Sequence, residues 1–221
     1  MTPKQKQNAK FKKWEGWLKT IHEDIRELLK RKYIFREVQE IIKSNPKIHK
    51  PSSFYDWLSI VHSVDISIGI RRQLDADKKS VSFIRLLTAI IEEPEVLSRE
   101  RFVGLYPDEE YRQDYGHKEF DDFAGKGNAY IDPKLVKADL NYLLESGKDI
   151  KEFANKRVAH SSENSYLKPV TDTKVVACLD LLEKLLVKYY LLFHAKTYGR
   201  ILPVWQYDWK EIFREPWIPT E

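Results

Sequence analysis

The stretch Asp149–His160 brings cations, an amide and a histidine together. Asp149 and Glu152 have the spacing of a capping box, which predicts a helix that begins near Ile150. Such a helix carries four polar side chains towards its C-terminal end: Asn155, Lys156, Arg157 and His160. A histidine beside an arginine at this end of a helix can bind a phosphate group or transfer a proton near neutral pH. In the structural alternative, His160 only caps the last carbonyl groups of the helix.

A second group of charges falls within an otherwise apolar stretch. Four charged residues lie on or directly after a predicted helix over 54–74: Asp65, Arg71, Arg72 and Asp75. A charge in apolar surroundings has to be paired or to take part in binding. The two arginines are therefore candidate phosphate ligands, and the alternative is an Asp–Arg salt bridge between turns of the same helix.

The sequence lacks the residue patterns that several other kinds of site require. The sequence Gly125-Lys126-Gly127 has neither the spacing nor the flanking elements of a nucleotide-binding loop. The six histidines are dispersed, and no His-x-x-x-His or Cys-x-x-Cys pair indicates a zinc site. Adjacent carboxylates such as Asp121-Asp122 have no partners at the spacing of a di-metal centre. We therefore expect neither a metal nor another cofactor.

The composition is that of an ordinary globular protein. Of 221 residues, 42% are hydrophobic and 33% are charged, which is sufficient for a folded core. The single cysteine, Cys178, can form no internal disulfide, so we expect a core residue in a reducing compartment. No stretch resembles a signal peptide or a membrane span, which predicts a cytoplasmic protein without membrane contact. The net charge of +4 permits a nucleic-acid partner without requiring one.

Apolar residues recur three or four positions apart over most of the chain, which predicts helices and no sheet. The helix 54–74 is apolar on nearly every side, so we expect it to be the central and most buried one. Two further helices are expected from Pro133 to a stop at Gly147, and from Thr171 or Thr173 to Gly199. Because no repeat or change of composition divides the chain, residues 1–221 are predicted to form a single all-α domain, a helical bundle.

Three segments are expected to lie outside the regular helices. Residues 1–10 are basic and are predicted to be flexible. Residues 106–132 are predicted to form a long loop insert, whose aromatic side chains either pin it to the core or stack on bases. Residues 200–221 form a tail that is too rich in aromatic residues to be disordered, so it should pack on the bundle or on a second subunit.

Three segments of the chain resemble the HEPN superfamily, specifically its abortive-infection AbiU-type branch. They are Ile70-Arg-Arg-Gln-Leu-Asp75, Lys79-Ser-Val-Ser-Phe-Ile-Arg-Leu-Leu87 and Asn155-Lys-Arg-Val-Ala-His160. The resemblance runs from the second predicted helix to the end, and it implies a helical bundle that is often dimeric. Many HEPN proteins are metal-independent endoribonucleases of toxin or phage-defence systems. Their signature is an arginine, a polar residue and, a few positions later, a histidine.

Carried onto this sequence, the polar residue of the signature is Asn155 and the histidine is His160, whereas Ala154 stands at the arginine position. Arg157 is close in sequence, and an arginine from another helix could replace the missing one. The resemblance implies catalytic roles for three residues: His160, Arg157 and Asn155. It implies substrate binding by three others: Arg71, Arg72 and Lys156.

Three roles fit these residues: an enzymatic one, a binding one and a purely structural one. In the first, His160 is a general acid or base in RNA cleavage, and Arg157 or Arg72 holds the phosphate. The substrate is then RNA, because DNA lacks the 2′-hydroxyl group, and a homodimer would bring both copies of His160 to one cleft. In the second, the chain is a non-catalytic module that binds RNA, a nucleotide or a partner protein from the same operon. In the third, these segments only maintain the bundle and its dimer interface.

Overall fold

The computed structural model describes residues 1–158 and 170–217, without the side chains at positions 113, 114, 157 and 158. Within these residues the chain forms eight α-helices and no β-strand, which confirms the predicted all-α fold. The helices are α1 (Pro3–Ser44), α2 (Ser53–Gln73), α3 (Phe83–Glu92), α4 (Arg99–Val103), α5 (Glu109–Tyr111), α6 (His117–Ala124), α7 (Pro133–Phe153) and α8 (Asp172–His194). The chain also has four short helical turns, of which the last lies in the C-terminal tail: η1 (Pro94–Val96), η2 (Arg112–Gly116), η3 (Ala154–Val158) and η4 (Glu211–Phe213).

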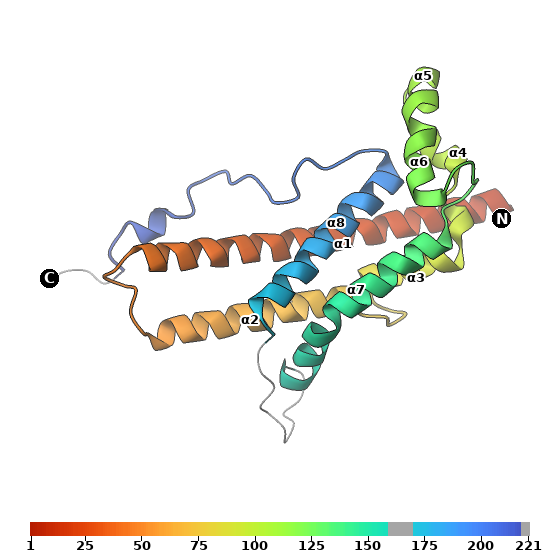
Figure 1. Ribbon diagram of the computed structural model, residues 1–221. Helices are drawn as coiled ribbons and strands as arrows, with labels where there is room; N and C mark the ends of the chain where they lie inside the picture. Colours follow the sequence, from red (N-terminus) through yellow and green to blue (C-terminus); the bar gives the residue numbers. More distant parts are fainter. Residues whose placement is uncertain (159–169, 218–221) are drawn as a thin grey trace.

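The core lies where α8 crosses the other long helices. α1 and α2 run antiparallel to each other, α8 packs across them, and α7 packs against α2, α3 and α8 (Figure 1). The most deeply buried side chains of α8 include Cys178, Leu182 and Tyr189. Cys178 is completely buried, which confirms the predicted core residue, and this burial raises the pKa of its thiol to about 11.

Residues 3–10, which the sequence predicted to be flexible, form the first turns of helix α1. Thr2 and Gln5 form a reciprocal capping box, and Pro3 occupies the first helical position. These contacts satisfy backbone groups at the very start of the chain and start α1 there. Apolar residues from Trp14 to Leu29 recur three or four positions apart and are buried, as the periodicity of the sequence predicts for one face of a helix.

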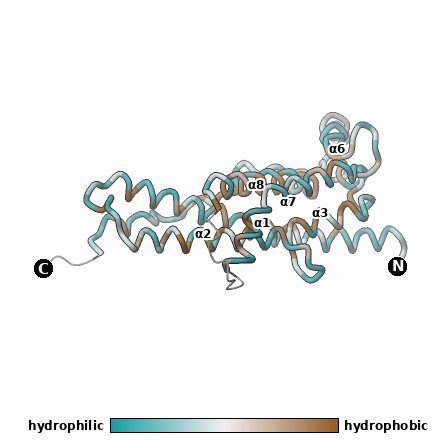
Figure 2. The backbone as a smooth tube through the Cα atoms, turned by 60° about the horizontal axis from the view of Figure 1, so that its bottom comes forward, coloured by the Kyte–Doolittle hydropathy of each residue, from teal (hydrophilic) through white to brown (hydrophobic). Residues whose placement is uncertain are grey.

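α2 is not the central helix that its composition predicted. Only its C-terminal half is covered, at Ile66, Ser67, Ile70 and Gln73. Its N-terminal half extends with the end of α1 beyond α7 and α8, and Figure 2 shows hydrophobic residues along this part as well. The hydrophobic residues on every side of α2 therefore did not indicate that the rest of the chain buries this helix. The central helix is α8 instead.

α7 continues through the position where the sequence predicted a stop. Asp132 caps its start, but Gly147 and Asp149 both lie within the helix. Gly147 lies against Leu74, so this glycine allows two helices to approach closely rather than ending one. Asp149 forms an ion pair with Lys174 of α8 instead of a capping box. The helix predicted to start near Ile150 is thus the last part of α7, followed directly by η3.

Residues 106–132 are largely helical, which corrects the predicted loop insert. α5, η2 and α6 follow one another, and Phe120 and Phe123 of α6 are buried against Phe102 of α4. These rings pin the segment to the core, as one of the two sequence alternatives expected. The segment is irregular only at residues 106–108, before α5, and in the connection after α6.

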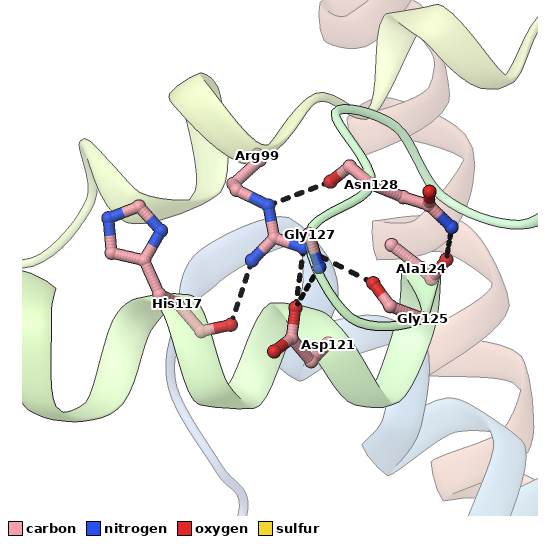
Figure 3. A network of polar contacts seen from close by, with 7 residues as sticks. All are labelled: Arg99, His117, Asp121, Ala124, Gly125, Gly127 and Asn128. Atoms are coloured by element: carbon pink, nitrogen blue, oxygen red, sulfur yellow. Dashed lines mark hydrogen bonds and ion pairs between the residues drawn. The ribbon is translucent and has the colours of Figure 1, made fainter.

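Arg99 holds that irregular connection in place (Figure 3). Its guanidinium group donates to Asp121 Oδ1 at 2.6 Å and to the carbonyl oxygens of His117 and Asn128 at 2.9 and 2.7 Å. Gly125 and Gly127 have positive φ angles of 81° and 75°, which side chains rarely adopt. The turn therefore needs both glycines and a cation that satisfies its carbonyl groups.

The C-terminal tail packs back on the bundle. After α8 the chain returns along α1 towards the C-terminal end of that helix (Figure 1). The Trp205 ring stacks on Tyr33, and Lys210 forms an ion pair with Glu37. As far as residue 217, the tail therefore contacts α1, which is one of the two positions predicted for it. In the described part of the chain, no helix combines the length and the apolar character that crossing a membrane requires.

Candidate functional site

The C-terminal end of α2 meets η3 through a side-chain hydrogen bond between two candidate residues. Arg71 Nε donates to Asn155 Oδ1. Arg71 is exposed and Asn155 is half-buried, so further donors of the guanidinium group face solvent. The structure thus joins two of the three segments that carry the family resemblance.

Arg72 faces a different partner. Its Nη2 lies 3.3 Å from Asp24 Oδ2 of α1, and the neighbouring Gln73 donates to the same carboxylate at 3.0 Å. Arg31 of α1 likewise pairs with Asp65 of α2 at 2.8 Å. The alternative of salt bridges between turns of α2 was therefore wrong, because these charges join α2 to α1. Of the two adjacent arginines, only Arg71 contacts Asn155.

An open groove lined by lysines lies beside the Arg71–Asn155 contact. It has a volume of about 430 Å³ and is lined by Leu144, Lys148, Lys151, Glu152, Asn155 and Lys156. Lys156 pairs with Glu152 at 2.5 Å, and Lys151 donates to the carbonyl oxygen of Leu74 at 3.1 Å. Lys148 makes no ion pair within the described residues. The groove therefore has more cations than its one glutamate neutralises, which suits an anionic ligand.

The backbone of η3 determines which side chains reach this groove. Ala154 is only 1% exposed, so its side chain faces the core. An arginine at this position, where the family signature has one, would have to direct its charge into apolar surroundings. Asn155 and Lys156 are the next residues along the chain and face the groove.

The remaining predicted residues are not placed by the structure. The backbone of Arg157 belongs to η3, but its side chain is not described, and His160 lies outside the described residues. The roles assigned to both therefore stay predictions. Among the described residues, no cluster of histidine, cysteine and carboxylate side chains could hold a metal ion.

Sequence reasoning missed a second cavity, which lies between α1, α2 and the start of α8. It has a volume of about 440 Å³, and its polar lining includes Lys32, Arg36, Gln39, Ser59, His62, Ser63 and Asp172. The His62 ring stacks on Phe35, with 3.8 Å between centroids. Burial lowers the pKa of His62, although Asp65 and Asp172 oppose this shift. His62 lies four residues from both Leu58 and Ile66, so it shares a helix face with them. This spacing was the only sign in the sequence that His62 lies between helices rather than in solvent.

The second cavity suits an anion less well than the groove on α7. Lys32 is already paired with Asp180 at 2.8 Å, and Asp172 adds a negative charge to the lining. The groove beside Arg71 and Asn155 is therefore the better candidate for binding phosphate. Comparison of the chain with protein-family models, with curated proteins and with solved structures found no match.

Proposed function

We propose that this chain is a HEPN-like RNA-binding protein that holds RNA phosphates at the end of α2 and along the groove of α7. The observation that carries the proposal is the hydrogen bond from Arg71 to Asn155, beside the lysines of the groove. A guanidinium group fixed by one acceptor keeps its other donors in a defined direction, which favours binding of a phosphate oxygen.

Metal-independent cleavage of RNA is the activity that we propose for this site. Arg71 takes the role of the signature arginine, and His160 acts as general acid or base on the ribose 2′-hydroxyl or the leaving oxygen. The family resemblance supports this reaction and a cytoplasmic role in a toxin or phage-defence system. The partners are then RNA, a second copy of the chain and a protein from the same operon.

One observation favours a non-catalytic alternative. Ala154 is buried, so the position of the signature arginine cannot present a charge to the groove without a change in η3. In this alternative, the same groove binds RNA without cleaving it. Both versions share the phosphate contact of Arg71, and they differ only in the role of His160.

Binding is tested with a fluorescent single-stranded RNA at several salt concentrations. We expect Arg71→Ala to weaken the affinity about tenfold, the usual effect of losing a charge-assisted hydrogen bond. The slope of log K against log salt should become shallower by about 0.7, the value for one lost phosphate contact on a single strand. Arg72→Ala is the matched control, because Arg72 faces Asp24. Equal effects of the two substitutions would contradict the assignment of the site.

A further inference from the structure

One face of α2 exposes a continuous apolar stripe that no described part of the chain covers. Its members alternate at spacings of three and four, as at the a and d positions of a coiled-coil seam: Phe54, Trp57, Val61, Val64 and Ile68. All of them except the half-buried Val64 are exposed, and Trp57 is 56% exposed. Ile60 flanks the stripe and is 57% exposed. We call these six residues the α2 seam.

The α2 seam is large for a surface that stays in water. With exposed fractions between 36% and 57%, its five exposed side chains present roughly 300–400 Å² of apolar surface, and Phe54 and Trp57 supply about half of it, since a full aromatic side chain offers about 150–250 Å². Contiguous apolar patches on monomeric proteins seldom exceed a few hundred Å², and large ones mark interaction sites. Two such faces together supply about 600–800 Å² of apolar surface, which makes the apolar centre of a small interface below the standard 1,200–2,000 Å².

We propose that the α2 seam binds the α2 seam of a second copy of this chain, with the two helices antiparallel. With the two-fold axis between Val61 and Val64, Val61 of each copy lies opposite Val64 of the other. Trp57 of each copy then lies opposite Ile68 of the other, and Phe54 lies opposite Arg71. A face that is complementary to itself in this way makes a closed dimer with C2 symmetry.

The charges of α2 select the antiparallel orientation. Asp56 lies near the start of the helix, and Arg71 and Arg72 lie near its end. A parallel pair would bring the arginines of both copies side by side, where like charges repel. An antiparallel pair brings each arginine end to the partner's first turn, where the ring of Phe54 offers a cation–π contact.

The dimer and the proposed RNA site meet at Arg71, whose guanidinium face lies on the partner's Phe54 while its N–H edge stays available to Asn155 and a phosphate. Arg71 lies about 13 Å along the helix from the two-fold axis, at 1.5 Å per residue, so the two copies of Arg71 are about 25 Å apart. The two Arg71–Asn155 contacts therefore stay at opposite ends of the interface. Two sites at this separation hold two segments of RNA rather than one shared phosphate.

The oligomeric state of the full chain tests the α2 seam. Analytical ultracentrifugation of the wild-type protein at micromolar concentration should give a dimer. Replacing Trp57→Glu and Val61→Glu together should raise the dimer dissociation constant at least about tenfold, because both side chains lie near the two-fold axis. Tyr142→Glu is the matched control, since Tyr142 is 66% exposed on α7 and lies outside the seam. A monomeric wild type, or a double variant that dimerises normally, would overturn the proposal.

Cysteine cross-linking tests the orientation. Trp57→Cys and Ile68→Cys are made as separate proteins, and the buried Cys178 does not compete. With oxidised glutathione, each variant alone should stay uncross-linked, because its two copies of the new thiol are about 16 Å apart along the helix. The mixture should give a disulfide-linked dimer, since residue 57 faces residue 68. Cross-linking of either variant alone, or none in the mixture, contradicts antiparallel pairing, and circular dichroism checks that every variant is folded.

Discussion

Gly147 of α7 lies directly against Leu74, the residue that caps the C-terminal end of α2. A Cβ atom at position 147 would come within 2.3 Å of Leu74 Cδ1, far inside van der Waals contact. Gly69 of α2 gives the same closeness to Leu28 of α1, at 2.2 Å. Two glycines thus let α2 sit tightly between α1 and α7. This approach brings Arg71 of α2 within reach of Asn155.

We expect Gly147→Ala to lower the free energy of unfolding by about 1–3 kcal/mol, the usual effect of overpacking a core. The new methyl group meets buried Leu74, which outweighs the gain of about 1 kcal/mol in helix propensity. Gly16→Ala is the matched control, because nothing lies within 4 Å of its Cβ position, and it should stabilise α1. Urea denaturation measures both. A Gly147→Ala protein as stable as the control would contradict the close approach of α2 and α7.

The Arg99–Asp121 pair should make stability depend on pH. The hydrogen bond from Arg99 holds the pKa of the Asp121 carboxyl below its ordinary value. The folded state therefore binds this proton less readily than the unfolded chain, so the pair stabilises the fold above the unfolded pKa of about 4. This contribution is lost as the pH falls through the lower, folded pKa.

Asp121→Asn should accordingly lower the free energy of unfolding at neutral pH, and the difference from wild type should vanish in acid. Asp122→Asn is the control, since Asp122 makes no ion pair within the described residues. Denaturation curves between neutral pH and about pH 3 cover the range in which the carboxyl titrates. A difference that persists in acid would show that Asp121 acts through packing instead.

The long helices of this protein could be predicted from local pattern, but α5 and α6 could not, and burial could be predicted only for a helix with a single apolar face. The stripe from Trp14 to Leu29 has one apolar face, so its period alone indicated the buried side. α2 is apolar all round, and nothing in its own sequence tells that α7 and α8 cover only its C-terminal half. Gly147 was misread because a glycine that ends a helix and one that allows close packing look alike until the partner, Leu74, is known.

The candidate site was predicted in part, for a similar reason. Asn155 and Lys156 were identified from their own segment, and the structure places both at the groove of α7. The choice between Arg71 and Arg72 depends on the rotation of α2 against α1 and α7, which adjacent positions in a sequence cannot reveal. Lys148 was missed because the helix was expected to stop at Gly147, which hid its alignment with Asn155. Lys151 lay within the helix predicted from Ile150, but its own segment does not show that it borders a groove beside α2.

Restoring the family signature at Ala154 should damage the protein rather than activate it. Ala154→Arg places a charge at a position that is 1% exposed, so we expect a loss of about 3 kcal/mol or more in the free energy of unfolding. Lys156→Arg is the control and should change stability by less than about 0.5 kcal/mol, because Lys156 is exposed. Thermal and urea unfolding compare the two variants. An Ala154→Arg protein of normal stability with increased RNA cleavage would mean that η3 can turn this position towards the groove.

The last prediction separates the catalytic version of the proposed function from the binding version. If the chain cleaves RNA, the reaction should continue in EDTA and leave a 2′,3′-cyclic phosphate, because the attacking group is the ribose hydroxyl and no metal takes part. His160→Ala should then lower the rate about a hundredfold or more, the usual scale for a lost general acid or base. Arg71→Ala should also lower the rate, since Arg71 holds the phosphate on which charge develops. His49→Ala is the control, because His49 is exposed and remote in sequence from both segments.

Three outcomes of that experiment assign the chain to different functions. Cleavage that falls with His160→Ala but not with His49→Ala supports the endoribonuclease. RNA binding that depends on Arg71, without cleavage in any variant, identifies a non-catalytic module and agrees with the burial of Ala154. A wild-type protein that neither binds nor cleaves RNA would leave the Arg71–Asn155 bond as a structural tie between α2 and η3. In that case Arg71→Ala should change only the free energy of unfolding, by about 0.5–1.5 kcal/mol for one hydrogen bond.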